Sequence, residues 1–136
     1  MMKRLLSLVL SIALMLCLSG CVIEFEPYYE TEGHTLTFVE GKEVVMYDEP
    51  YFGLFFDYTN ESGETAVPCD HINVKAFQNG VELQVAVFVG ERTEGAIQCD
   101  TSVQDGTTVR VVWLFERVDE SPVSVETTDG QKFVVE

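Results

Sequence analysis

The chain contains few basic residues. Its 136 residues include 8 lysines and arginines against 23 aspartates and glutamates, which gives a formal net charge of −15. Proteins that bind nucleic acid use basic surfaces to neutralise phosphates, so we expect no nucleic-acid partner. The same acidity disfavours a protein that lies flat on an anionic membrane surface.

Histidines and the sequence motifs of enzymes are also scarce. The chain has two histidines, His34 and His71, and no Gly-x-Ser-x-Gly motif. Asp70 and His71 resemble a base with its orienting carboxylate, but neighbours on a strand point to opposite faces. We therefore expect no catalytic residues, no cofactor and no functional role for His34.

The one long apolar run lies at the N-terminus. Lys3 and Arg4 precede an apolar run that ends at Leu18, and Ser19-Gly20-Cys21 follow it. The run is shorter than the roughly 20 residues that span a bilayer. This pattern is typical of a bacterial secretory signal that ends in a lipobox, with cleavage before Cys21. Ordinary signal cleavage after Gly20, without a lipid, is the alternative.

Lipidation of Cys21 would anchor the protein, by palmitate or a similar acyl chain, on the extracytoplasmic face of the cell membrane. The signal, residues 1–20, contains two of the eight basic residues and no acidic ones. The remaining 116 residues therefore have a net charge of −17 and are enough for one domain. We predict an acidic tether over residues 21–33 and a folded domain over residues 34–136.

Two cysteines, Cys69 and Cys99, remain after Cys17 leaves with the signal and Cys21 receives the lipid. An even pair in an oxidising compartment predicts a disulfide bond, which would close a loop of about 30 residues and add about 3–4 kcal/mol of stability. A Cys₂His metal site with His71 is conceivable, because Cys69 and His71 would share a strand face. No Cys-x-x-Cys or His-x-x-x-His spacing supports it, so we expect no metal.

From His34 onward the apolar residues repeat every second position, which is typical of strands. Asn79-Gly80 is the preferred pair for a two-residue hairpin turn. This turn predicts the cross-strand pairs Ala76–Leu83, Val74–Val85 and Ile72–Val87.

Two more hairpins are predicted. A three-residue loop that ends in Gly130 pairs Val125 with Phe133 and Val123 with Val135. A turn at Gly41-Lys42 would join residues 36–39 to residues 44–47. The segments 51–58 and 109–115 are predicted to be central strands.

Seven or eight short strands with regularly spaced turns favour an all-β fold, an immunoglobulin-like antiparallel β-sandwich. A small closed barrel is the alternative.

Four stretches resemble a family of uncharacterised single-domain lipoproteins from Gram-positive bacteria, in which an immunoglobulin-like domain follows a lipobox. The stretches are residues 57–62, 75–83, 105–109 and 121–125, and the likeness covers residues 44–127. Gln104-Asp105-Gly106 stands where a Lys-Pro-Gly type of turn is expected, which affects a loop alone. The resemblance implies the fold, export and anchoring, and it implies no activity.

Three aromatic residues, Tyr51, Phe55 and Phe77, fall on the faces opposite to the expected core. Burial under a loop or an edge strand is the simpler explanation, and an exposed patch that binds a partner is the alternative. We keep the three residues as candidate binding residues. The sequence thus predicts a non-catalytic interaction or scaffolding module with an unknown envelope protein as partner. Its acidity favours a second hypothesis, a binding protein for a cation or a small basic ligand.

Overall fold

The computed structural model describes residues 31–136. The predicted signal, the predicted lipidation site Cys21 and the predicted tether up to Glu30 lie outside the described residues. Within residues 31–136, no helix is both long and apolar enough to cross a membrane.

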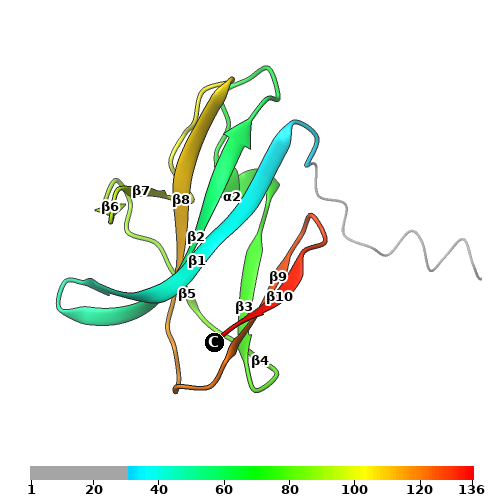
Figure 1. The fold of residues 1–136 in the computed structure, drawn as a ribbon. Helices are drawn as coiled ribbons and strands as arrows, with labels where there is room; N and C mark the ends of the chain where they lie inside the picture. Colours follow the sequence, from blue (N-terminus) through cyan, green and yellow to red (C-terminus); the bar gives the residue numbers. More distant parts are fainter. Residues whose placement is uncertain (1–30) are drawn as a thin grey trace, which may run out of the picture.

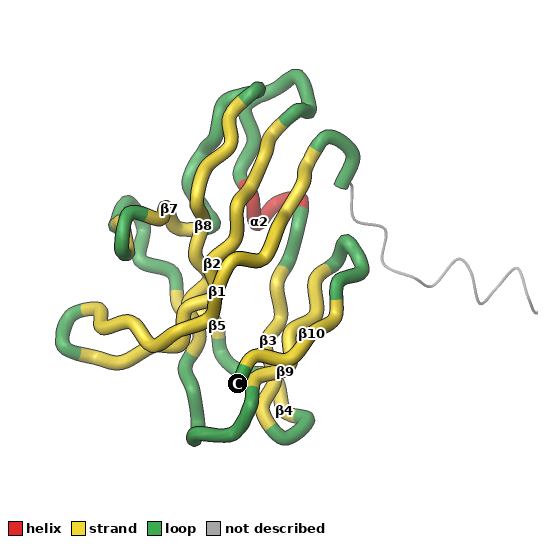
Figure 2. Tube along the Cα trace, viewed as in Figure 1, coloured by secondary structure: helices red, strands yellow, loops and turns green. Residues whose placement is uncertain are grey.

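The described residues form two β-sheets that face each other, as Figures 1 and 2 show. The elements are β1 (His34–Met46), β2 (Glu49–Asn60), α2 (Pro68–His71), β3 (Val74–Gln78), β4 (Val81–Glu82), β5 (Val85–Ala86), β6 (Arg92–Thr93), β7 (Ala96–Gln98), β8 (Thr107–Phe115), β9 (Val123–Thr127) and β10 (Lys132–Val135). The first sheet has the strand order β1-β2-β8-β7-β6, with β5 also paired to β8, and the second has the order β10-β9-β3-β4. All neighbouring strands are antiparallel except β7 and β8. The predicted all-β sandwich is therefore confirmed.

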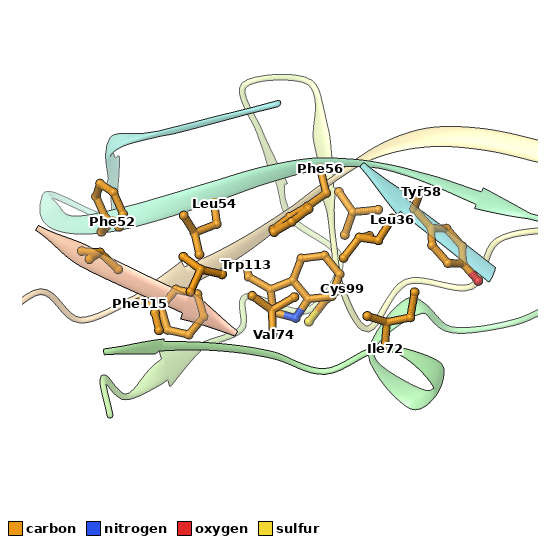
Figure 3. Close-up of a cluster of buried hydrophobic side chains, with 14 of the residues drawn as sticks. Leu36, Phe52, Leu54, Phe56, Tyr58, Ile72, Val74, Cys99, Trp113 and Phe115 are labelled. Carbon is orange, nitrogen blue, oxygen red and sulfur yellow. The ribbon is translucent and has the colours of Figure 1, made fainter. Parts of the chain in front are cut away.

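The main core lies between the two sheets. Figure 3 shows Trp113 of β8 between side chains of β2 and Val74 of β3. The Trp113 ring packs edge-on against Phe56, with ring centroids 5.4 Å apart. As the alternation predicts, one face of each central strand is buried here: Phe52, Leu54, Phe56 and Tyr58 of β2, and Val111, Trp113 and Phe115 of β8. Burial of each large apolar side chain contributes about 1.5–3 kcal/mol to folding.

Two predicted turns are confirmed. Gln78 pairs with Val81 across Asn79-Gly80, and both turn residues have the positive φ angles of the expected hairpin turn. At the C-terminus β10 pairs with β9 in the preferred register, and Gly130 adopts a φ of 93°.

The first of these hairpins is shorter than predicted. It ends where the Leu83 N–H donates to the Ala76 carbonyl oxygen. The chain then crosses to the other sheet, so Val85 pairs with Phe115 of β8 and Val74 pairs with Thr127 of β9. The pairs Val74–Val85 and Ile72–Val87 are wrong, because an alternating pattern does not show when a strand changes sheets.

The predicted turn at Gly41-Lys42 is also wrong. Both residues lie within β1, which continues past a bulge after Phe38 and pairs with β2 along its whole length. The chain turns instead at Tyr47-Asp48, where φ is 50° and 64°. Gly41 has a packing role, because a Cβ atom there would lie 2.7 Å from Cγ1 of Val135. Glycine thus allows β1 and β10 to approach closely along one side of the sandwich.

A second, outer cluster covers the other face of the first sheet. Its buried members are Val44, Phe55, Ala96, Val112 and Leu114. Phe88, from the segment between β5 and β6, packs against it and covers it from outside. The first sheet is therefore apolar on both faces.

Candidate functional site

The structure has a hollow at each end of the sandwich. The first, which we call the histidine cleft, has a volume of about 410 Å³ and is lined by Glu32, Gly33, His34, Glu61, Ser62, Glu64, Thr65, Ala66 and His71. The second, which we call the distal pocket, has a volume of about 140 Å³ and is lined by Glu43, Pro50, Tyr51, Phe52, Arg117, Val118, Asp119 and Glu120. In Figure 1 the loop between β8 and β9, which borders the distal pocket, lies at the opposite end of the sandwich from the start of β1.

Two stacked imidazole rings form one wall of the histidine cleft. The rings of His34 and His71 lie 3.8 Å apart, centroid to centroid, with an angle of 13° between them. His34 is 8% exposed, and its Nδ1 atom is 2.6 Å from the hydroxyl oxygen of Tyr58. Burial raises the pKa of the Tyr58 hydroxyl above its ordinary value.

This arrangement corrects one expectation, because His71 lies on the helical turn α2 and not on a strand. His34 is packed and bonded at the end of the core, which is a structural role, and the absence of a functional role for it stays a prediction. No local pattern in the sequence predicts the pair, because the two residues are 37 positions apart and meet through the fold alone.

Beneath the cleft, the side chain of Asn60 joins two loops. Its Nδ2 atom donates to the carbonyl oxygens of Glu64 at 2.7 Å and of Val103 at 2.9 Å. Its Oδ1 atom accepts from the backbone N–H and the hydroxyl of Ser62. Asn60 is fully buried and both ends of its amide are bonded, which is typical of a structural residue.

The distal pocket is built on a loop that Gln78 holds in place. The buried Gln78 amide donates to the carbonyl oxygens of Asp119 at 3.0 Å and of Ser121 at 2.8 Å, and it accepts from the N–H of Val118 at 2.8 Å. Hydrogen bonds from Ser121 hold the pKa of the Asp119 carboxyl below its usual value. The loop is therefore preorganised by its own bonds.

Arg117 stands out in this loop. Its guanidinium lies 4.9 Å from the ring centroid of Phe52, and its Nη2 atom donates to the carbonyl oxygen of Ser121 at 3.0 Å. Its Nε atom is buried and has no hydrogen-bond partner among residues 31–136. Buried donors are almost always paired in proteins, so this one calls for an acceptor.

The structure does not bring the three candidate aromatic residues together. Phe55 is 2% exposed in the outer cluster, with the Lys42 ammonium 5.1 Å from its ring centroid. It is therefore buried, as the simpler explanation predicts, and the alternative of an exposed patch is wrong for this residue. Tyr51 is half-buried, packs edge-on against Phe88 and lines the distal pocket. Phe77 is half-buried on β3 of the other sheet.

Cys69 and Cys99 are neighbours, but the structure contains both as free thiols, so the predicted disulfide is not found. The Cys69 N–H donates to the Cys99 carbonyl oxygen at 3.0 Å. A hydrogen bond from the Cys99 thiol lowers the pKa of Cys69, and the same bond together with burial raises the pKa of Cys99. Cys69 lies on α2 and not on the expected strand. Within the described residues, no group of three or more His, Cys, Asp or Glu is arranged to hold a metal ion.

Comparison with models of known protein families finds a match for the chain. Residues 34–129 match the model of DUF5067, a domain of unknown function. The chain belongs to this family. No curated protein and no solved structure matches it. The description of the DUF5067 family assigns no activity, so roles for its residues have to be argued from their geometry.

Proposed function

We propose that this DUF5067 protein is a membrane-anchored extracytoplasmic lipoprotein whose immunoglobulin-like sandwich binds another envelope protein and does not catalyse a reaction. The lipobox that ends at Cys21 supports the anchor. The distal pocket supports the binding role. Because it lies at the end of the domain opposite to the start of β1, a domain anchored through its N-terminus would present it away from the membrane.

The observation that carries the proposal is the size of this pocket together with what surrounds it. Sites for small molecules measure about 300–1,000 Å³, and the distal pocket holds about 140 Å³. It is large enough for one side chain of a partner. Val118, which lines the pocket, is 80% exposed, and Val45, paired with Pro50 across the β1–β2 hairpin, is 64% exposed. Apolar side chains exposed beside such a hollow are typical of protein-binding surfaces.

Photo-crosslinking in intact cells tests this function. A photoreactive amino acid at Val118 should give a crosslinked adduct of one defined mass. The matched control is the same substitution at Val134, which is 63% exposed on the edge strand β10. Cys21→Ala should abolish incorporation of labelled palmitate and weaken the adduct. Equal adducts at Val118 and Val134, or none at any exposed position, would contradict the proposal.

The histidine cleft favours a second candidate, a binding protein for a small basic ligand. Its volume of about 410 Å³ lies within the range of small-molecule sites, and Glu32, Glu61 and Glu64 line it. A thermal-shift assay with spermidine tests this candidate. Spermidine at 100 times its dissociation constant should stabilise the fold by about 2.7 kcal/mol. Glu61→Gln/Glu64→Gln should remove the shift, and a shift that survives in this variant would place the ligand elsewhere.

A further inference from the structure

We infer that the distal pocket binds an extended segment of a partner protein in which an apolar side chain is flanked by lysine or arginine. The apolar side chain enters the pocket, and a backbone carbonyl of the segment accepts a hydrogen bond from the guanidinium of Arg117. The inference rests on the proposed function and names the chemistry of the partner.

The volume and lining of the pocket set the size of the inserted group. A volume of about 140 Å³ lies below the range of small-molecule sites and leaves room for a single branched side chain such as that of leucine. Pro50, Phe52 and Val118 provide apolar contact surface. A branched aliphatic side chain would gain both burial and close contacts there.

Arg117 supplies hydrogen-bond donors beside the pocket. Stacking on Phe52 and the bond to Ser121 hold its guanidinium in place. Arg117 is half-buried and lines the pocket, so this fixed guanidinium can donate to an oxygen of a bound segment. Because the loop is already ordered by Gln78, little entropy is lost when a partner binds.

The charges around the pocket select the partner. Glu43 and Glu120 are exposed at its rim, and no basic residue lines it other than Arg117. The rim carboxylates would repel a carboxylate of the partner, so a neutral backbone carbonyl is the better acceptor for Arg117. Basic side chains on either side of the inserted residue would be attracted to the rim carboxylates. A second copy of the chain is disfavoured as occupant, because each copy would bring a net charge of about −17.

Fluorescence anisotropy with defined peptides tests the inference on the exported domain. The probe is a fluorescein-labelled nine-residue peptide of alternating lysine and leucine, compared with matched peptides in which glutamate or serine replaces lysine. We expect the lysine peptide to bind at least tenfold more tightly than either of the others. Its affinity should fall as salt is raised, because the rim charges become screened.

Two variants locate the binding. Val118→Ser should weaken binding of the lysine peptide about fivefold through lost apolar contact, and Glu43→Gln/Glu120→Gln should weaken it about tenfold. The control Val134→Ser changes another exposed valine, on the edge strand β10 and outside the lining of the pocket, and should leave the affinity unchanged within twofold. All these changes are on exposed side chains, so the fold should be retained.

Three results would overturn the inference: tighter binding of the glutamate peptide, equal binding by the wild type and both pocket variants, or no binding of the lysine peptide. None of them would remove the proposed function, which the crosslinking at Val118 tests separately. A defined adduct at Val118 without binding of the lysine peptide would mean that the site is right and the partner chemistry is wrong.

Discussion

The two ends of the sandwich treat their buried polar groups differently. At the end with the histidine cleft, the amide of Asn60 makes four hydrogen bonds and Tyr58 is bonded to His34. Oδ1 of Asp100, beside the cysteine pair at this end, is also buried without a partner, but Asp100 does not line the cleft. At the other end, Arg117 keeps a buried Nε atom without a partner beside the exposed Val118. Satisfied polar groups stabilise a fold, and an unsatisfied one beside a hollow is a feature expected of a binding site.

This contrast teaches that the presence of polar residues in a hollow does not by itself identify the binding site of this protein. The histidine cleft contains the two histidines, a residue type common in catalytic sites, but most of the hydrogen bonds at this end of the domain hold loops together. The distal pocket is smaller and is lined by a single arginine, Arg117, whose buried Nε atom has no hydrogen-bond partner among the described residues. If the contrast holds, changes at the first end should affect mainly stability and changes at the second mainly binding.

The largest effect should come from oxidation of the cysteine pair at the first end. The Cys69 thiolate attacks oxidised glutathione and releases one glutathione, and Cys99 then displaces the second to leave the Cys69–Cys99 bond. The two protein thiols lose two electrons and two protons, and oxidised glutathione is reduced to two glutathione molecules. Closure of a loop of about 30 residues should raise the free energy of unfolding by about 3–4 kcal/mol. Urea denaturation before and after oxidation measures it, with Cys99→Ser as control, and two thiols that still titrate after oxidation would refute it.

Asn60→Ala should lower the free energy of unfolding by about 2–3 kcal/mol. The carbonyl oxygens of Glu64 and Val103 would lose their donor in a buried site. Thr59→Ala is the control, because its hydroxyl bonds Thr108 at the surface and its loss should cost under about 1 kcal/mol. Equal losses in the two variants, measured by urea denaturation, would show that the amide network is not structural.

Tyr58→Phe should cost about 1–2 kcal/mol at neutral pH, because it removes the bond to His34. It should also change the response to alkali. The folded-state pKa of Tyr58 lies above its ordinary value of 10.0, so the unfolded chain releases this proton first. Wild-type stability should therefore fall as pH rises above 10, and part of this fall should be absent in Tyr58→Phe. Identical alkaline profiles for the two proteins would contradict burial of the hydroxyl.

Arg117→Met should change stability by less than about 1 kcal/mol, because the loss of one bond is offset by removal of an unpaired buried donor. It should weaken binding of the lysine peptide about tenfold. Arg110→Met is the matched control. Arg110 pairs with Asp57 at the surface, 2.7 Å apart, so its loss should affect neither stability nor binding by much. A large drop in stability for Arg117→Met would mean that Arg117 is structural.

The sequence predicts most of the strands because alternation reports directly which face is buried. It identifies the central strands β2 and β8 and two of the turns, where Asn79-Gly80 and Gly130 have the required positive φ angles. It fails at Gly41, where glycine allows contact with Val135 instead of a turn. It also fails after Leu83, because pairing with β8 depends on residues about 30 positions away.

The candidate site is less predictable than the fold. Tyr51 is identified from its position opposite the core face, and it does line the distal pocket. Phe55 shows the same pattern but is covered by the segment around Phe88, which alternation within β2 cannot report. The role of Arg117 depends on Phe52, Ser121 and a missing acceptor, none of which leaves a local signal in the sequence.

Mapping of backbone amide chemical shifts by NMR tests the central claim most directly, because it monitors both ends of the domain in one titration with the lysine peptide. We expect saturable shifts at Phe52, Arg117 and Val118 and none at His34 or His71. Shifts confined to His34 and His71, with none in the loop between β8 and β9, would contradict the assignment of the distal pocket as the binding site.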